Sequence, residues 1–145
     1  NVTTITIENL KALSVNSQVV AIGETGLDAL KGASIEKQIE IFKLHISLSE
    51  QVKKPLIIHC VKAFNEIITI KKQLKPSMPW IIHGFRGKPQ LAQQLLNNGF
   101  YISLGEKFNP ETASIIPIDR LLFETDESTL DINKIIDSIN NNHIL

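Results

Sequence analysis

Four residues able to bind a metal ion follow short apolar runs in this sequence. The runs, each with the residue that ends it, are Val20-Ala-Ile-Gly-Glu24, Leu56-Ile-Ile-His59, Trp80-Ile-Ile-His83 and Leu122-Phe-Glu-Thr-Asp126. Imidazole and carboxylate groups together suit zinc, manganese or iron and, less well, magnesium. A bound ion lowers the pKa of its water toward neutrality, which produces a hydroxide nucleophile. The pattern therefore indicates metal-assisted hydrolysis, provided that the four side chains meet.

Five strands are predicted, and four of them carry the candidate ligands. Each run is nearly continuously apolar and rich in β-branched residues, which is typical of strands buried on both faces of a parallel sheet. The carboxyl ends of parallel strands open on one side, where ligands bind in barrels and in open sheets. We therefore expect the four candidate ligands to converge. The predicted strands are residues 18–22, 55–58, 78–82, 99–103 and 119–123.

Amphipathic segments alternate with these strands. In the clearest, residues 34–52, Ile35, Phe42 and Ile46 share one stripe and Ser34 is the predicted N-cap. The alternation predicts one α/β domain over residues 1–145. Two architectures remain open, a doubly wound sheet and a partial (β/α) TIM-type barrel of about five of eight units, since a complete barrel needs ~250 residues. The predicted helices are residues 6–13, 34–52, 62–74, 88–98 and 131–142.

Each candidate ligand also has a structural interpretation. Either histidine could be an interior residue with its hydrogen bonds satisfied. Glu24 could accept hydrogen bonds in a turn between its flanking glycines, and Asp126 could cap the last helix, as could Ser128 or Thr129. Arg86 stands in the glycine-bracketed loop after His83 and is a candidate phosphate contact, because a planar guanidinium matches phosphate oxygens. A surface arginine without function is the alternative.

Composition excludes several classes of protein. No apolar run approaches the ~18 residues that cross a bilayer, so no membrane partner is expected. Fifteen basic and fifteen acidic residues give zero net charge, which disfavours a long basic stripe for nucleic acid and makes any nucleic acid a substrate held at a few points. The single cysteine, Cys60, requires no oxidising compartment, so a cytoplasmic location is expected. Strand alternation turns Cys60 away from His59, which disfavours a Cys-His nucleophile.

Taken in order, these segments resemble the TatD family of metal-dependent deoxyribonucleases, within the amidohydrolase-like barrels. Residues 22–28, Ile-Gly-Glu-Thr-Gly-Leu-Asp, resemble the family's G-E-x-G-L-D, and Gln38 and Phe42 match a spaced Q and F on the following helix. Residues 55–59 resemble P-x-x-I-H, residues 83–87 resemble H-x-F-x-G, and residues 124–126 resemble E-T-D. The motifs extend across nearly the whole chain.

The resemblance implies a barrel with two divalent ions, zinc, manganese or magnesium. It implies that Glu24 bridges the ions, that His59 and His83 bind one of them, and that Asp126 binds the other or orients its water. Glu24 and Asp126 are then the catalytic carboxylates, and the reaction is cleavage of a phosphodiester, with DNA as the favoured substrate.

The chain also departs from the family pattern. The family's opening H-x-H is absent and the sequence begins at Asn1, so we expect the C-terminal five units of a barrel, completed by an N-terminal segment or by self-association. Val61 stands where the family often has arginine, with Lys62 as an imperfect substitute for substrate binding. Glu127 and Ser128 replace the usual small residue and proline.

Three other functions remain open. The same ligands could serve an amidohydrolase-like enzyme that cuts an amide, lactone or ester. The chain could be a non-catalytic barrel piece that serves as a binding or assembly surface. A Schiff-base enzyme using Lys62 is the weakest alternative, because nothing else at the site suits that chemistry.

Overall fold

A computed structural model describes residues 4–126 and 128–142 of the chain. Glu127, one of the departures from the family pattern, therefore lies outside the described residues. The chain divides into two compact units, Asn1–Trp80 and Ile81–Leu145. Among the described residues, no helix combines the length and the hydropathy that crossing a membrane requires.

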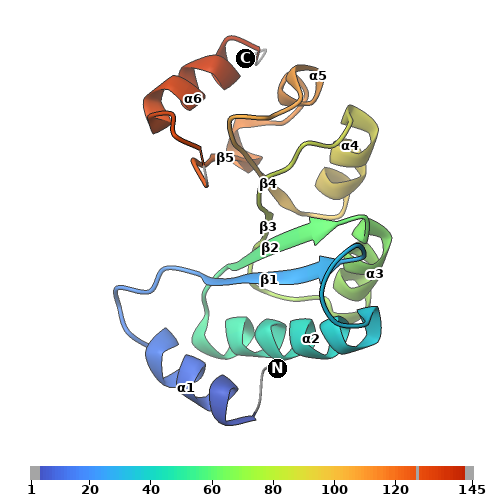
Figure 1. Cartoon of the computed structure of the whole chain (residues 1–145), viewed down its shortest axis with the longest axis vertical. Helices are drawn as coiled ribbons and strands as arrows, with labels where there is room; N and C mark the ends of the chain where they lie inside the picture. Colours follow the sequence, from blue (N-terminus) through green and yellow to red (C-terminus); the bar gives the residue numbers. More distant parts are fainter. Residues whose placement is uncertain (1–3, 127, 143–145) are drawn as a thin grey trace. The chain divides into compact units, whose positions relative to one another are not determined.

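The first unit consists of two parallel strands with helices packed beside them (Figure 1). Helix α2 (Ile35–Val52) contacts both β1 (Ile22–Asp28) and β2 (Leu56–Val61), and α1 (Thr4–Ser14) contacts α2. Helix α3 (Phe64–Leu74) follows β2 and packs on it. The buried side chains include Leu27, Phe42, Leu56, Ile58 and Trp80. Apolar burial on the two strands and on one face of α2 is thus what fixes the positions of the strand ends.

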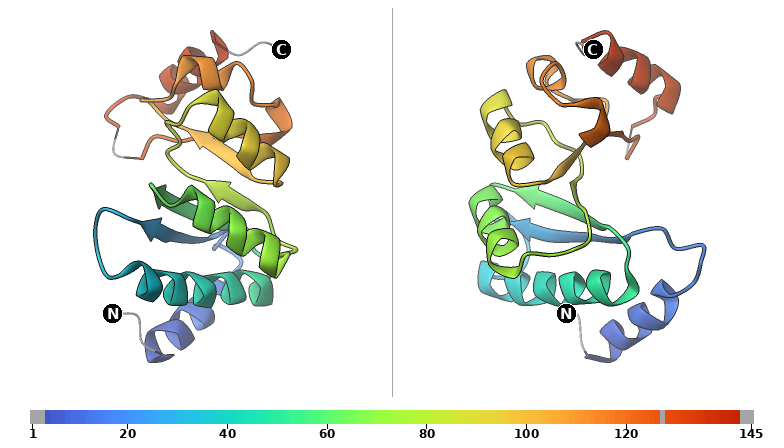
Figure 2. Two further views of the ribbon diagram at one scale, coloured as in Figure 1. Left: turned by 90° about the vertical axis from the view of Figure 1, so that its right-hand side faces the viewer. Right: turned by 180° about the vertical axis from the view of Figure 1, so that it is seen from behind.

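In the second unit, β3 (Trp80–Ile82), which begins at the last residue of the first unit, is followed by α4 (Pro89–Asn97) and β4 (Tyr101–Leu104). A short helix α5 (Pro110–Ala113), a 3₁₀ turn η1 (Ile118–Arg120), β5 (Leu121–Phe123) and α6 (Ile132–Asn140) complete it. Strand β4 pairs in parallel with both β3 and β5. Figure 2 shows α4 beside β4, and the two elements are in contact.

The predicted alternation of five parallel strands with helices is confirmed. Ser34 is the N-cap of α2, and its side chain accepts a hydrogen bond from the Lys37 backbone N–H. Helices α5 and η1 were not predicted, because a single turn has too few positions to show a period. The assignment of residues 1–145 to one domain stays a prediction.

The predicted position of the first strand is wrong. The sequence predicts this strand at residues 18–22, with Glu24 at its end, but β1 begins at Ile22 and extends through Gly23 and Gly26 to Asp28. The reason is close approach to β2. A Cβ atom at Gly23 would lie 2.5 Å from the Ile57 carbonyl oxygen, and one at Gly26 would collide with the His59 carbonyl oxygen. Glu24 therefore lies inside a strand instead of at its end.

Candidate functional site

In the first unit, one histidine ring lies between two carboxylates. Gly26 on β1 is the register partner of His59 on β2. Glu24 and Asp28, the residues two positions before and after Gly26, both reach the His59 ring. His59 Nδ1 is 3.2 Å from Glu24 Oε1, and His59 Nε2 is 3.7 Å from Asp28 Oδ2. The side chains of His59 and Glu24 are each 45% exposed, so this cluster is open to a ligand from solvent.

Asp28 is held in place by backbone groups. Its Oδ1 accepts hydrogen bonds from the backbone N–H groups of Leu30, at 2.8 Å, and Lys31, at 3.1 Å. The Leu30 N–H is the main reason that the pKa of Asp28 lies below its ordinary value, although desolvation opposes it. The Lys31 N–H and His59 lower it further. Asp28 is thus kept as a carboxylate, the form that binds cations.

Gln38, on α2, fixes the backbone that follows β1. Its Oε1 accepts from the Asp28 N–H at 2.7 Å, and its Nε2 donates to the Asp28 carbonyl oxygen at 3.0 Å. The same Nε2 also lies within hydrogen-bonding distance of the Lys31 and Ala33 carbonyl oxygens. The side chain that matches the family's spaced glutamine therefore has a positioning role that the sequence did not predict.

In the second unit, a histidine and two carboxylates form a second cluster. His83 directly follows β3, and Glu124 directly follows β5. Glu124 Oε2 lies 2.8 Å from His83 Nδ1 and accepts a 2.7 Å hydrogen bond from Ser103 Oγ. His83 Nε2 is 3.7 Å from Asp126 Oδ1. Donation from Nδ1 to Glu124 assigns the other ring nitrogen, Nε2, as the lone-pair donor, which is the usual arrangement of a metal-binding histidine and its supporting carboxylate.

Two glycines lie beside the Glu124 carboxylate. A Cβ atom at Gly84 or at Gly105 would lie 3.4 Å from Glu124 Oε1, which is an ordinary van der Waals contact. Gly84 also adopts a φ of +63°, which L side chains rarely adopt. The Glu124 side chain is only 15% exposed, whereas the Asp126 side chain is 53% exposed.

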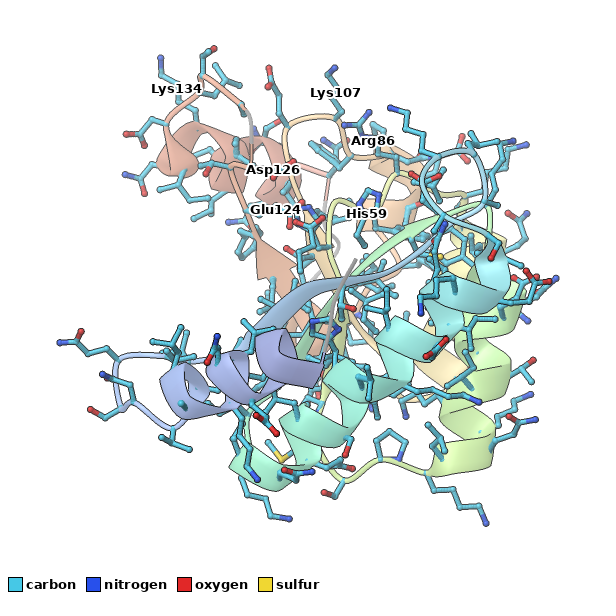
Figure 3. The ribbon with its side chains drawn as sticks, turned by 60° about the horizontal axis from the view of Figure 1, so that its bottom comes forward. His59, Arg86, Lys107, Glu124, Asp126 and Lys134 are labelled. Carbon is cyan, nitrogen blue, oxygen red and sulfur yellow. The ribbon has the colours of Figure 1, made fainter. Side chains whose placement is uncertain are left out.

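Asp126 does not cap the last helix, so that alternative is wrong. The N-cap of α6 is Asp131, whose side chain accepts from the Asn133 N–H. Asp126 instead lines a cavity of about 300 Å³ in the second unit, together with Glu124 and Arg86. Figure 3 shows Arg86 on the loop after β3, on the same side of the unit as Asp126. The predicted phosphate contact thus lies beside a predicted metal ligand.

The predicted site residues form two groups. The structure brings Glu24 together with His59, and His83 together with Asp126. Lys62 directly follows β2 and is exposed. That the two pairs share one metal centre stays a prediction. Burial raises the pKa of the Cys60 thiol to about 12, which disfavours its reactive thiolate form.

Sequence reasoning missed two carboxylates, Asp28 and Glu124. Both stand within the motifs quoted above, and each follows an apolar residue at or just beyond a strand end. Their position at the end of a predicted strand is the sequence feature that could have identified these two carboxylates. Their roles depend on which histidine each one reaches, which is set by strand pairing.

The donor set fits a divalent metal. Each unit offers an imidazole nitrogen beside carboxylate oxygens, the combination that binds zinc or manganese. His83 also has the carboxylate partner that fixes the tautomer of metal-binding histidines. The contacts between these histidines and carboxylates form without an ion, so the ligand atoms are oriented before a metal binds.

Known proteins resemble this chain over most of its length. The family described as TatD related DNase matches residues 2–135. An uncharacterized metal-dependent hydrolase of Buchnera aphidicola subsp. Baizongia pistaciae is 42% identical over 130 residues, covering 83% of this chain and 49% of that protein. The 3'-5' ssDNA/RNA exonuclease TatD of Erwinia amylovora is 33% identical over 132 residues, covering 83% of this chain and 51% of that protein.

A solved structure confirms the fold. The crystal structure of YJJV, a TatD homolog from Escherichia coli, matches with a TM-score of 0.85 at 22% identity, covering 99% of this chain and 64% of that chain. The predicted α/β fold, five parallel strands alternating with helices as part of a TatD-type barrel, is therefore confirmed. The chain spans about half the length of the curated relatives it matches.

Proposed function

The chain belongs to the family of TatD-related DNases, and from that premise we propose that it takes part in metal-dependent hydrolysis of phosphodiester bonds, with DNA as the favoured substrate. The observation that carries the proposal is the pair of histidine–carboxylate clusters, Glu24–His59–Asp28 and His83–Glu124–Asp126. Relatives described as metal-dependent hydrolases support it. The name of the Erwinia relative supports nucleic acid as the substrate class.

We propose Glu24, His59, His83 and Asp126 as the metal ligands and zinc, manganese or magnesium as the ion. When bound, such an ion polarises the phosphoryl group and supplies hydroxide at neutral pH. The residues of the chain provide the rest. Glu124 holds the His83 ring through Nδ1. Asp126, with its exposed carboxylate, is suited to accept a proton from the attacking water at Oδ1 or to orient that water.

Two cations are proposed to bind the substrate. Arg86 lies at the cavity that Asp126 lines, where its guanidinium can bind two phosphate oxygens at once. Lys62, exposed after β2 in the first unit, is proposed as a second phosphate contact. Neither interaction requires a basic surface, which agrees with a net charge of zero.

The H-x-H pair of the family has no counterpart among these 145 residues. We therefore propose that full coordination of a second ion draws on another segment or on a second copy of the chain. The cytoplasm is the compartment we propose, because a single cysteine needs no oxidising environment.

The test compares three substrates with and without metal. After treatment with a chelator, the protein is assayed with zinc, manganese or magnesium on single-stranded DNA, on a chromogenic phosphodiester and on a chromogenic ester. We expect metal-stimulated cleavage of both phosphodiesters, reduced more than about 100-fold by His83→Ala because removing a ligand removes the ion's contribution. His45→Gln is the matched control. His45 lies on α2 outside both clusters, so the substitution should leave the cleavage rate unchanged.

Two results would overturn the proposal. Preferential cleavage of the ester would favour the amidohydrolase-like alternative, which the same ligands can serve. Failure to bind any of the three metals by a protein with native circular dichroism would favour a non-catalytic binding surface.

A further inference from the structure

We propose that the loop between β4 and α5, residues 105–108, forms a nucleotide subsite beside Asp126, in which Lys107 binds a backbone phosphate and Phe108 contacts a base of single-stranded DNA. The inference rests on the proposed function, because it names how the substrate of that site is held. We call residues 105–108 the β4–α5 loop.

The cavity in the second unit gives the subsite its place. It measures about 300 Å³, and its lining includes Arg86, Lys107, Phe108 and Asp126. That volume is at the lower end of the range for small-molecule sites. It suits one nucleotide unit at the end of a strand, whereas a double helix presents its bases stacked and paired. A terminal nucleotide here would lie next to the carboxylate that we assign to the metal.

Lys107 has the charge and the exposure that a phosphate contact needs. Its side chain is exposed, and it forms no ion pair with any residue among 4–126 and 128–142. Figure 3 shows Lys107 and Arg86 on adjacent loops, on the side of the unit where Asp126 lies. Two cations from separate loops can each bind a different phosphate of one strand, which a single guanidinium cannot do.

The β4–α5 loop is held in shape by its own hydrogen bonds. The Phe108 N–H donates to the Gly105 carbonyl oxygen at 3.2 Å, closing a turn. Ser128 Oγ donates to Glu106 Oε2 at 2.6 Å, which ties the loop to the segment after Asp126. Asn109 then begins α5 as its N-cap, accepting from the Glu111 N–H. A loop ordered before binding loses less conformational entropy when the ligand arrives.

Phe108 supplies an aromatic surface at the cavity. It is half-buried, so that its ring is held by the fold while part of it remains accessible. Bases of single strands stack on such rings without regard to sequence. Stacking requires an unpaired base, and Phe108 therefore makes the subsite selective for single strands over duplex.

The experiment measures binding of a fluorescently labelled thymidine octamer by anisotropy in the presence of EDTA, so that hydrolysis cannot occur. We expect Lys107→Ala to weaken binding about fivefold at moderate salt and to reduce the slope of log affinity against log salt by about 0.7, the value for one phosphate contact on a single strand. Lys134→Ala is the matched control. Lys134 is an exposed lysine on α6 that does not line the cavity, and its removal should change neither quantity.

A second variant tests the base contact. Phe108→Leu keeps an apolar side chain in the loop but removes the aromatic face. We expect it to weaken binding of the thymidine octamer about tenfold and to leave binding of an abasic octamer unchanged. Equal losses on both octamers would show a structural effect and would overturn the stacking role.

Two further outcomes would overturn the phosphate role. One is Lys107→Ala behaving like Lys134→Ala. The other is inorganic phosphate displacing the octamer at equal phosphate concentration, which would indicate a site for the free anion. The measurement is independent of the proposed hydrolysis. If binding depends on Lys107 but no metal-stimulated cleavage is found, the proposed function is refuted and the subsite is supported. If cleavage is found but binding does not depend on Lys107, the subsite is refuted and the proposed function is supported.

Discussion

The two arginines of the chain, Arg86 and Arg120, occupy contrasting environments. Arg86 is exposed on a loop and lines the cavity beside Asp126. Arg120 donates from NH1 to the Phe100 carbonyl oxygen at 3.1 Å, and its guanidinium carbon lies 5.1 Å from the centroid of the Tyr101 ring. The first arginine is available to a ligand, while the second stabilises the packing around β4.

We predict that Arg86→Ala and Arg120→Ala separate binding from stability. Arg86→Ala should raise the KM for a phosphodiester about tenfold and change the free energy of unfolding little, because it removes the proposed phosphate contact and no hydrogen bond or ion pair among residues 4–126 and 128–142. Arg120→Ala should lower the free energy of unfolding by about 1 to 2 kcal/mol and leave KM unchanged. Steady-state kinetics and urea denaturation of both variants check this, and an unchanged KM for Arg86→Ala would remove its assigned role.

At the residue scale, the sequence predicts candidate ligands but not the contacts that support them. Histidines and carboxylates after apolar runs identify His59, His83, Glu24 and Asp126 without any coordinates. The contact from Glu124 to His83 joins residues 41 positions apart in sequence, through the pairing of β3, β4 and β5. Only the strand register decides which carboxylate supports which ring, and a single sequence does not specify it.

At the element scale, β1 depends on glycine for its contact with β2. Gly26 has a φ of +142° and faces the His59 backbone, whereas Gly32, with a φ of +86°, has only Gln38 Nε2 near its Cβ position, at 3.6 Å. Both positions disfavour L side chains, but only Gly26 also lacks space. The strand could not be located from hydrophobicity alone, because these glycines read as a turn signal when pairing is unknown.

We predict that Gly26→Ala is much more damaging than Gly32→Ala. Backbone strain alone should cost Gly32→Ala about 1 kcal/mol of unfolding free energy. Gly26→Ala adds a collision with the His59 carbonyl and should cost about 3 kcal/mol or more. Because that collision also displaces His59, the variant should lose metal affinity as well. Denaturation and metal titration of the two variants measure the difference, and equal losses would show that the close approach is unimportant.

Helix α2 is also tied to the segment before β3, through Glu50. Its carboxylate accepts hydrogen bonds from the Ser77 backbone and hydroxyl and from the Met78 N–H. Burial alone would raise the pKa of Glu50, but these donors outweigh it and hold the pKa below the ordinary 4.5. A carboxyl whose pKa is lowered by folding stabilises the protein above its unfolded-state pKa, and that contribution is lost as the pH falls through the lowered value.

We predict a pH-dependent loss for Glu50→Gln. At pH 7 the variant should be less stable by about 1 kcal/mol, since Glu50 is half-buried and the energies of its hydrogen bonds are discounted for solvent screening. The difference should shrink as the pH falls below 4.5, where the wild-type carboxyl becomes protonated. Urea denaturation across this range provides the measurement, with Glu40→Gln on the exposed face of α2 as control. A difference that persists at low pH would mean that the amide, and not the lost charge, causes the effect.

At the scale of the whole molecule, the proposed metal centre takes ligands for one ion from both units. Glu24 and His59 belong to the first unit, and His83 and Asp126 to the second. The amphipathic pattern predicts the elements of each unit, and the resemblance implies a shared centre. A ligand that binds only the folded state stabilises it by about 2.7 kcal/mol at 100 times its dissociation constant. Metal-induced stabilisation therefore reports on every residue that holds the ion.

We predict that the effects of His59→Ala and His83→Ala on metal-induced stabilisation are strongly non-additive. If both histidines hold one ion, either substitution should remove most of the metal-induced rise in the unfolding midpoint, and the double variant should remove little more, because neighbouring ligands act as a unit. Two separate sites, one in each unit, would instead give single losses that add to the double loss. The measurement is thermal unfolding of the four proteins with and without zinc or manganese, with His45→Gln as control. Additive losses would assign each cluster its own ion and would refute the shared centre.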